Sequence, residues 1–191
     1  MESISKEDLE WDRARGRLNA KIQLAFAGVR LGGGIGLFEA DAWDMCTDPA
    51  KPAEARTRDE RESWHDLSEK DLAWCNTALC FTDAEGYRYL LPAFMLAELN
   101  SDIDVWTLIH LCHVQDAIHE KHALLNEQQL QTVIEFLELY LDDRGNELQH
   151  KDITDSLTEY WSPLLEKTKK QNKSSLPTGS SSTTSTPTAL P

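Results

Sequence analysis

The chain has 191 residues, 40% of them apolar and six of them tryptophan, which is enough for one domain with a substantial core. Residues 1–166 carry 15 basic against 33 acidic side chains, a balance of −18, and four lysines in the last segment bring the whole chain to −14. A surface this negative repels nucleic acid phosphates and anionic lipid headgroups, so we expect neither nucleic acid nor a membrane as a partner.

Two features of the sequence point to the cytoplasm. No apolar run approaches the roughly 18 residues that a membrane span needs, and the N-terminal "MESISKEDLE" does not resemble a signal peptide. The cysteines lack CxxC spacing and stand in apolar surroundings, which favours reduced, mostly buried thiols over a zinc or disulfide scaffold. These cysteines are Cys46, Cys75, Cys80 and Cys112.

The first third of the chain predicts two helices and a connector. After a flexible start (1–4), Ser5 is a plausible N-cap, and apolar residues then recur at helical spacing until "GGGIG" (32–36). That stripe consists of Leu18, Ile22, Ala25, Phe26 and Val29. "LFEADAWDM" (37–45) predicts a short helix, in which Trp43 can face the core. Residues 47–63 are polar and predict a solvated connector that regains helix near Glu60.

The segment 77–91, "TALCFTDAEGYRYLL", predicts a β-hairpin. Two β-prone runs flank "DAEG", and Gly86 can supply a positive φ in the turn. Pro92 would close the second strand and occupy the first turn of the next helix.

The second half of the chain predicts three helices. Residues 104–114 are mostly apolar and indicate a buried helix. The segment 127–143 has an apolar stripe behind Asn126, a good N-cap with Gln129 three residues later. A last helix carries apolar residues from Ile153 to Leu164 on one face and is perturbed at Pro163.

The predicted fold class is mainly α with one small β-hairpin (α+β). A single compact domain (5–166) precedes a Ser/Thr/Pro-rich tail (167–191) that buries too little to fold and should be disordered.

Four histidines within thirteen residues, in "HLCHVQDAIHEKH" (110–122), suggest a metal site. On a helix, His110 and His113 would share a face, as would His119 and His122, and such donors bind zinc or another divalent transition metal. However, all of these ligands come from one segment, directly before a capped helix, which favours a connector. The leading expectation is therefore no cofactor, with a metal-dependent enzyme as the alternative.

Other motifs carry little chemistry. "RLGGGIGLFEAD" (30–41) is neither a dinucleotide nor a phosphate-loop signature, and it follows a helix, so it predicts a joint between two helices. No serine nucleophile elbow, HExxH or EF-hand loop is present, and no Cys–His pair stands in a known signature.

"FTDAEGYRYLLPAFM" (81–95) resembles the hallmark of a family of uncharacterised bacterial proteins, a domain of unknown function. The resemblance rests on D-x-E-G, an aromatic-Arg-aromatic triplet and L-P-A-aromatic-M. Weaker similarity at 22–44, 58–67 and 124–141 extends it over roughly residues 18–142. It implies a compact, mainly helical domain with one hairpin, a variable joint at 101–123, and no particular reaction.

Arg88 is the charged residue of that motif. In a hairpin it would lie opposite Tyr87 and Tyr89, where it could pair with Asp83, Glu85, Asp59 or Glu60 as a structural ion pair beside Trp64. The functional alternative is a small groove that binds an anion or a peptide. Its residues would be Trp64, Asp83, Glu85, Tyr87 and Arg88.

The sequence therefore predicts a non-enzymatic, acidic protein-interaction module in the cytoplasm, with another protein, of basic character, as its partner. An immunity protein or antitoxin would be one concrete form. The alternatives are a metal-dependent enzyme using the His110–His122 cluster and an anionic-ligand-binding domain near Trp64 and Arg88.

Overall fold

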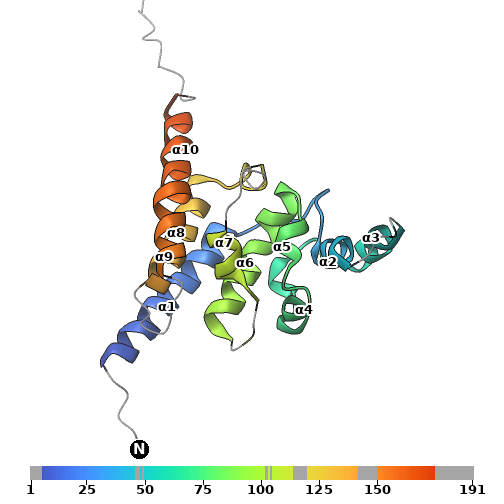
Figure 1. Ribbon diagram of the computed structural model, residues 1–191, viewed down its shortest axis with the longest axis horizontal. Coiled ribbons are helices and arrows are strands. Elements are labelled where there is room, and N and C mark those ends of the chain that lie inside the picture. The colour runs from blue at the N-terminus through green and yellow to red at the C-terminus, as the bar shows by residue number, and fades with distance from the viewer. Residues whose placement is uncertain are drawn as a thin grey trace, which may run out of the picture.

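The computed structural model describes residues 6–45, 48, 50–101, 103, 105–113, 120–141 and 150–174. Figure 1 shows α1, α8, α9 and α10 together at one side of the molecule, α6 and α7 in the middle, and α2 and α3 at the opposite end. The helices are α1 (Lys6–Ala25), α2 (Leu37–Met45), α3 (Ala50–Ala55), η1 (Arg56–Arg58), η2 (Trp64–Asp66), α4 (Glu69–Trp74), α5 (Ala78–Phe81), α6 (Ala84–Asn100), α7 (Thr107–Cys112), α8 (Glu127–Leu141), α9 (His150–Ser156), η5 (Leu157–Trp161) and α10 (Ser162–Ser174).

The predicted β-hairpin over 77–91 is wrong, because the described residues form helices and contain no strand. Asp83 is the N-cap of α6, and its carboxylate accepts a hydrogen bond from the Gly86 N–H at 2.8 Å. An aspartate at this position satisfies a backbone N–H that has no acceptor within the helix, so "DAEG" starts a helix where a turn was expected. The described part of the chain is all-α, not α+β.

The sequence of α6 looks β-prone because this helix is buried on most of its sides. Tyr89, Leu90 and Leu91 are all fully buried, and α6 contacts α1, α4, α5 and α7. A helix that is buried all round has no polar face, so its apolar run lacks the helical period and can be mistaken for a strand. Pro92 lies inside α6, not in a first turn, and its missing N–H leaves the Arg88 carbonyl without the usual helical donor.

The amphipathic helices α1 and α8 confirm their predicted stripes. Ile22 of α1 and Phe26, directly after that helix, are fully buried, as are Val133 and Leu137 of α8, and the two helices pack against each other. The predicted capping pair of α8 is also present. The Asn126 side chain accepts from the Gln129 N–H at 2.9 Å, and the Gln129 side chain accepts from the Asn126 N–H at 3.0 Å.

The C-terminal region contains a π-helical turn, η5, immediately before Pro163. Its Trp161 is fully buried and donates its indole N–H to the Leu111 carbonyl at 2.9 Å, which joins η5 to α7. Helix α10 continues through residues 167–174, which the sequence assigns to the tail; residues 175–191 and 1–5 lie outside the described residues. No helix in the described ranges is both long and apolar enough to cross a membrane.

The close approach of α6 to the loop before α2 gives a stability prediction. A Cβ atom at Gly86 would overlap the Ile35 carbonyl oxygen, and backbone atoms cannot move aside as a flexible side chain can. We expect Gly86→Ala to lower the free energy of unfolding by about 1–3 kcal/mol. The measurement is urea unfolding followed by tryptophan fluorescence.

Gly16→Ala is the matched control. Gly16 lies within α1, and no atom is within 4 Å of the Cβ position. Alanine there should raise the free energy of unfolding by about 0.5–1 kcal/mol through helix propensity. Equal effects of the two substitutions would contradict the close approach described for Gly86.

Candidate interaction groove

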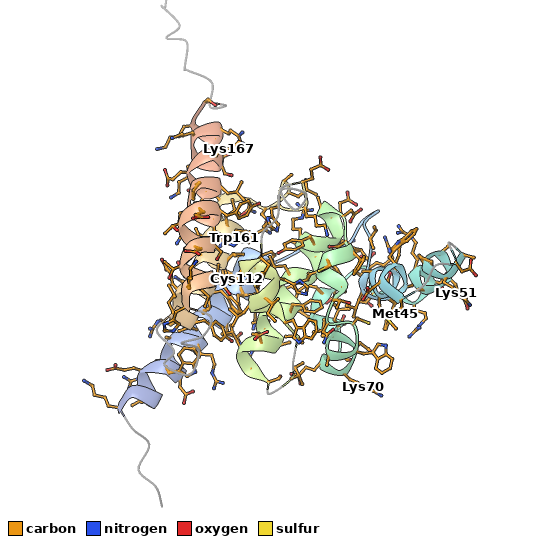
Figure 2. All side chains as sticks on the ribbon, in the orientation of Figure 1. Met45, Lys51, Lys70, Cys112, Trp161 and Lys167 are labelled. Atoms are coloured by element: carbon orange, nitrogen blue, oxygen red, sulfur yellow. The ribbon has the colours of Figure 1, made fainter. Side chains whose placement is uncertain are left out.

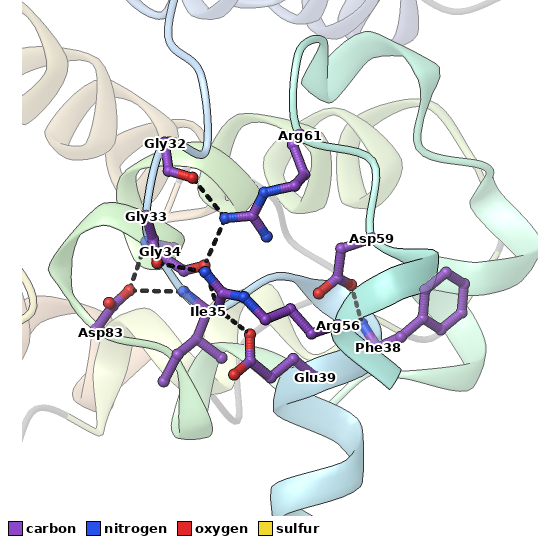
Figure 3. Close-up of polar contacts among 11 residues, drawn as sticks. Gly32, Gly33, Gly34, Ile35, Phe38, Glu39, Arg56, Asp59, Arg61 and Asp83 are labelled. Atoms are coloured by element: carbon purple, nitrogen blue, oxygen red, sulfur yellow. Dashed lines mark hydrogen bonds and ion pairs between the residues drawn. The ribbon is translucent and has the colours of Figure 1, made fainter. Parts of the chain in front are cut away.

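The glycine-rich loop 32–36 is held by two arginines that follow it in the chain. Arg56 donates to the Gly33 carbonyl at 2.7 Å and to the Gly34 carbonyl at 3.2 Å, and Arg61 donates to the carbonyls of Gly32 and Gly34. Figure 3 shows both guanidinium groups on the same side of the loop. Gly32 has a φ of 58°, a conformation that favours glycine. We call Arg56 and Arg61 on these three carbonyls the arginine clamp.

Two aspartates bind N–H groups that follow the clamped carbonyls. Asp83 accepts from the Ile35 N–H at 3.1 Å, and Asp59 accepts from the Phe38 N–H at 2.7 Å, in the first turn of α2. Burial raises the pKa of Asp59, and the hydrogen bonds from the backbone of α2 oppose that rise. With its carbonyls facing cations and its Ile35 N–H already paired, the loop is built as a joint between helices and not as a cradle for phosphate.

The Arg56 guanidinium also ties α2 to the clamp. It pairs with Glu39 of α2 at 2.5 Å, and the Glu39 side chain is only 11% exposed. A carboxylate removed from water in this way needs a paired cation. The pair therefore fixes the direction in which α2 leaves the loop, and with it one wall of the groove described next.

An open groove of about 800 Å³ lies between α2, the α3–η1 segment and α4. Figure 2 shows Met45, Lys51 and Lys70 at this end of the molecule, one from each wall. We call this depression the interaction groove. Its lining includes Phe38, Asp41, Met45, Arg58, Asp71 and Trp74.

Large apolar side chains of the interaction groove are open to solvent. Trp74 is 79% exposed and Met45 is 73% exposed, the two highest values among the large apolar residues described as exposed. Inside the groove, the Arg58 guanidinium lies 4.2 Å from the centre of the Phe38 ring, a cation–π contact that covers the aromatic face. Tryptophan and methionine at an open surface are residue types that protein interfaces favour.

Helix α2 carries two neighbouring acids, Asp41 and Asp44, of which Asp41 lines the interaction groove. Burial and the neighbouring Asp44 both raise the pKa of Asp41, while Arg58 acts in the opposite direction. Asp44 itself accepts from the Thr77 hydroxyl at 2.8 Å. Arg58 therefore already favours the ionised form of Asp41, in a groove that Lys51 and Lys70 also line.

A family model for a family of unknown function, DUF6714, matches residues 14–165, which is most of the chain and leaves out the first turns of α1 and most of α10. The chain belongs to the DUF6714 family. The resemblance seen at 81–95 is thus confirmed as far as membership of a family of unknown function, and the interaction groove lies wholly within the matched residues. No curated protein and no solved structure matches this DUF6714 chain.

The five residues predicted to form a groove around Arg88 have separate surroundings. Trp64 is buried and donates its indole N–H to the Phe26 carbonyl at 3.0 Å, and Tyr87 is buried. Asp83 and Glu85 are exposed in the first turn of α6, and the half-buried Arg88 forms no ion pair within the described ranges. A small pocket of about 150 Å³ includes Trp64 but none of the other four.

The histidines predicted as metal ligands contact different partners where they are described. His110 contacts the Asn76 carbonyl at 2.9 Å, exposed His113 contacts the Ile109 carbonyl of its own helix at 3.0 Å, and buried His122 contacts the Tyr160 hydroxyl at 2.6 Å. His119 lies outside the described residues. Within the described part of the chain, no three His, Cys, Asp or Glu side chains form a group able to hold a metal ion.

The interaction groove was missed at the level of sequence, although one signal for it exists. In "EKDLAWC", Leu72 and Trp74 stand two residues apart, so one helix cannot bury both on the same face. Leu72 is buried and Trp74 is exposed. Trp43, expected to face the core, is 47% exposed.

The Glu39–Arg56 pair gives a prediction about what holds α2. We expect Arg56→Met to lower the free energy of unfolding by about 1–3 kcal/mol, because it leaves the Glu39 carboxylate buried without its cation and frees two loop carbonyls. Adding Glu39→Gln should recover part of this loss, since a neutral amide is less costly to bury than an unpaired charge. Denaturant unfolding of the two single variants and the double variant measures the coupling. Strictly additive losses would contradict the pairing.

Proposed function

We propose that this protein is a non-enzymatic interaction module that binds a partner protein in the interaction groove. The proposal is carried by one observation, the exposure of Trp74 and Met45 beside a groove of about 800 Å³. Exposed tryptophan is costly to leave in water, and its burial at an interface recovers roughly 1.5–3 kcal/mol per large apolar side chain. The partner supplies the apolar surface for that burial.

The chemistry of the groove defines the partner segment. An apolar side chain packs on Trp74 and Met45, and a basic residue next to it pairs with Asp41 of the groove wall. The overall charge of −14 adds long-range attraction for a basic protein and speeds its association at low ionic strength. An aromatic or aliphatic residue beside lysine or arginine is therefore the recognition element that we infer.

Site-specific photo-crosslinking in the native host tests this function. A photoreactive phenylalanine analogue in place of Trp74 should form a crosslink to one partner protein, because the 79% exposed side chain lies at the groove. The matched control is the same analogue at Leu24, which is 68% exposed on α1 and lines a different depression between α1 and α8. Identical crosslink patterns at both positions, or crosslinks only to a second copy of this chain, would contradict the proposal.

Substitutions in the groove separate the apolar and the ionic contributions. With the captured partner in hand, Trp74→Ala should weaken binding by about 2 kcal/mol or more, as expected for an interface tryptophan. Asp41→Asn should reduce the association rate and its salt dependence. Leu24→Ala should leave both unchanged. Titration calorimetry and stopped-flow fluorescence at two salt concentrations measure these effects, and a Trp74→Ala variant with wild-type affinity would end the groove assignment.

A further inference from the structure

The fold brings Cys80 and His110 together from helices thirty residues apart in the chain. The Cys80 Sγ atom lies 3.4 Å from the His110 Nδ1 atom, and the His110 Nε2 atom lies 2.9 Å from the Asn76 carbonyl oxygen. A carbonyl oxygen can only accept, so Nε2 carries the ring proton and donates it. In the neutral imidazole Nδ1 is then the unprotonated nitrogen, and it faces the thiol as a base.

Cys80 differs in its surroundings from the other described cysteines. Its side chain is exposed, whereas Cys75 is buried and Cys112 is half-buried. Burial raises the pKa of Cys75 to about 12 and that of Cys112 to about 11, so neither forms a thiolate near neutral pH. Among the described residues, no histidine nitrogen contacts the sulfur of either, and the Cys112 Sγ atom lies 4.0 Å from the Ser156 hydroxyl. Exposure together with a base in contact is specific to Cys80 among the three.

Lys121 adds a positive charge near the thiol. Its ammonium group donates to the carbonyls of Leu79 and Cys80, which fixes it at the end of α5. This charge acts to lower the pKa of Cys80 and of His110, while Asp44 acts to raise the pKa of Cys80 and His113 acts to lower that of His110. A cation held there stabilises a developing thiolate.

We propose that Cys80 is a thiol modification site at which His110 acts as the base, and that its co-reactant is a low-molecular-weight disulfide. Nδ1 of His110 takes the proton from Sγ as the thiolate attacks one sulfur of the disulfide R–S–S–R. A new Cys80–S–S–R bond forms, the old S–S bond breaks, and the leaving thiolate takes the proton from His110 to give R–SH. The incoming disulfide is reduced and Cys80 is oxidised, so atoms and electrons balance.

The resting protonation states suit this role for His110. Burial lowers the pKa of His110, so the ring is neutral and able to accept a proton at neutral pH. Although Cys80 is an exposed residue, partial burial of its sulfur outweighs the charge of Lys121 and raises the pKa of Cys80, so the resting pair is a neutral thiol beside a neutral imidazole. Such a thiol reacts slowly unless a base removes its proton during the attack, which is what the geometry of His110 provides.

The test uses oxidised glutathione as the disulfide and peptide-resolved mass spectrometry to follow Cys80 alone. In the wild-type protein at pH 7 we expect Cys80 to be modified at least about tenfold faster than Cys75 and Cys112. His110→Gln should slow the modification of Cys80 about tenfold, because general base assistance is worth tenfold or more. The glutamine can still donate to the Asn76 carbonyl. His113→Ala, a change at an exposed histidine of the next turn, is the matched control and should leave the rate within twofold.

Two further readouts separate a base from a merely structural residue. Added imidazole should restore the Cys80 rate in His110→Ala, because it can occupy the space of the lost ring. Above the pKa of His110, the modification rate of Cys80 in the wild-type protein should rise less steeply with pH than the hydroxide concentration does. In His110→Gln the rate should rise in proportion to the hydroxide concentration across pH 6–8. If the variants fail to fold by circular dichroism, the wild-type pH profile decides.

Equal Cys80 rates in wild type and His110→Gln would overturn the proposal, as would a wild-type rate that follows hydroxide throughout. A failed rescue by imidazole, with both variants folded, would do the same. None of these measurements involves the interaction groove or its partner. A negative result for Cys80 therefore leaves the proposed binding function unaffected, and the reverse also holds.

Discussion

The arginine clamp is the interaction on which the rest of the structure depends. A loop of small residues between α1 and α2 presents three backbone carbonyls, and two guanidinium groups from residues 56 and 61 satisfy them. Each guanidinium supplies several fixed donors, which is why arginine suits this task better than lysine. Because the same Arg56 also pairs with Glu39, the clamp sets both the path of the loop and the direction of α2. The groove exists where it does because α2 is held there.

The loop and the central helix α6 depend on each other. Gly86 lets the first turn of α6 approach the Ile35 carbonyl, and Asp83 binds an N–H on each side of that contact. The "DAEGYRY" segment (83–89) therefore has a structural role. Its aspartate and glycine serve helix initiation and close packing, and its two tyrosines are buried in the core. What the protein recognises is inferred from a different part of the surface.

Sequence reasoning located the amphipathic helices well and the buried one badly. Periodicity and a capping pair are local signals, so α1 and α8 were predicted with their core residues. The prediction for α6 was wrong because its apolar surroundings come from several other elements, and burial against them leaves the helix without the polar face that identifies one. The exposure of Trp74 and the meeting of Cys80 with His110 depend on packing between segments far apart in the chain, for which spacing alone gives no measure. The histidines of 110–122 illustrate the same limit, because those that the structure describes are close in sequence but contact different partners once folded.

The double role of Asp83 bears on the order of folding. One carboxylate oxygen accepts from both Gly86, three residues away, and Ile35, 48 residues away. The local bond can form in an isolated turn, but the distant one requires a loop of 48 residues to close, which costs chain entropy before any contact repays it. The first turn of α6 therefore gains its full stabilisation only when the segment containing α2, α3 and α4 has already been enclosed. A non-local contact of this kind raises the contact order of a protein that is otherwise built from fast-forming helices, and its formation is a slow step.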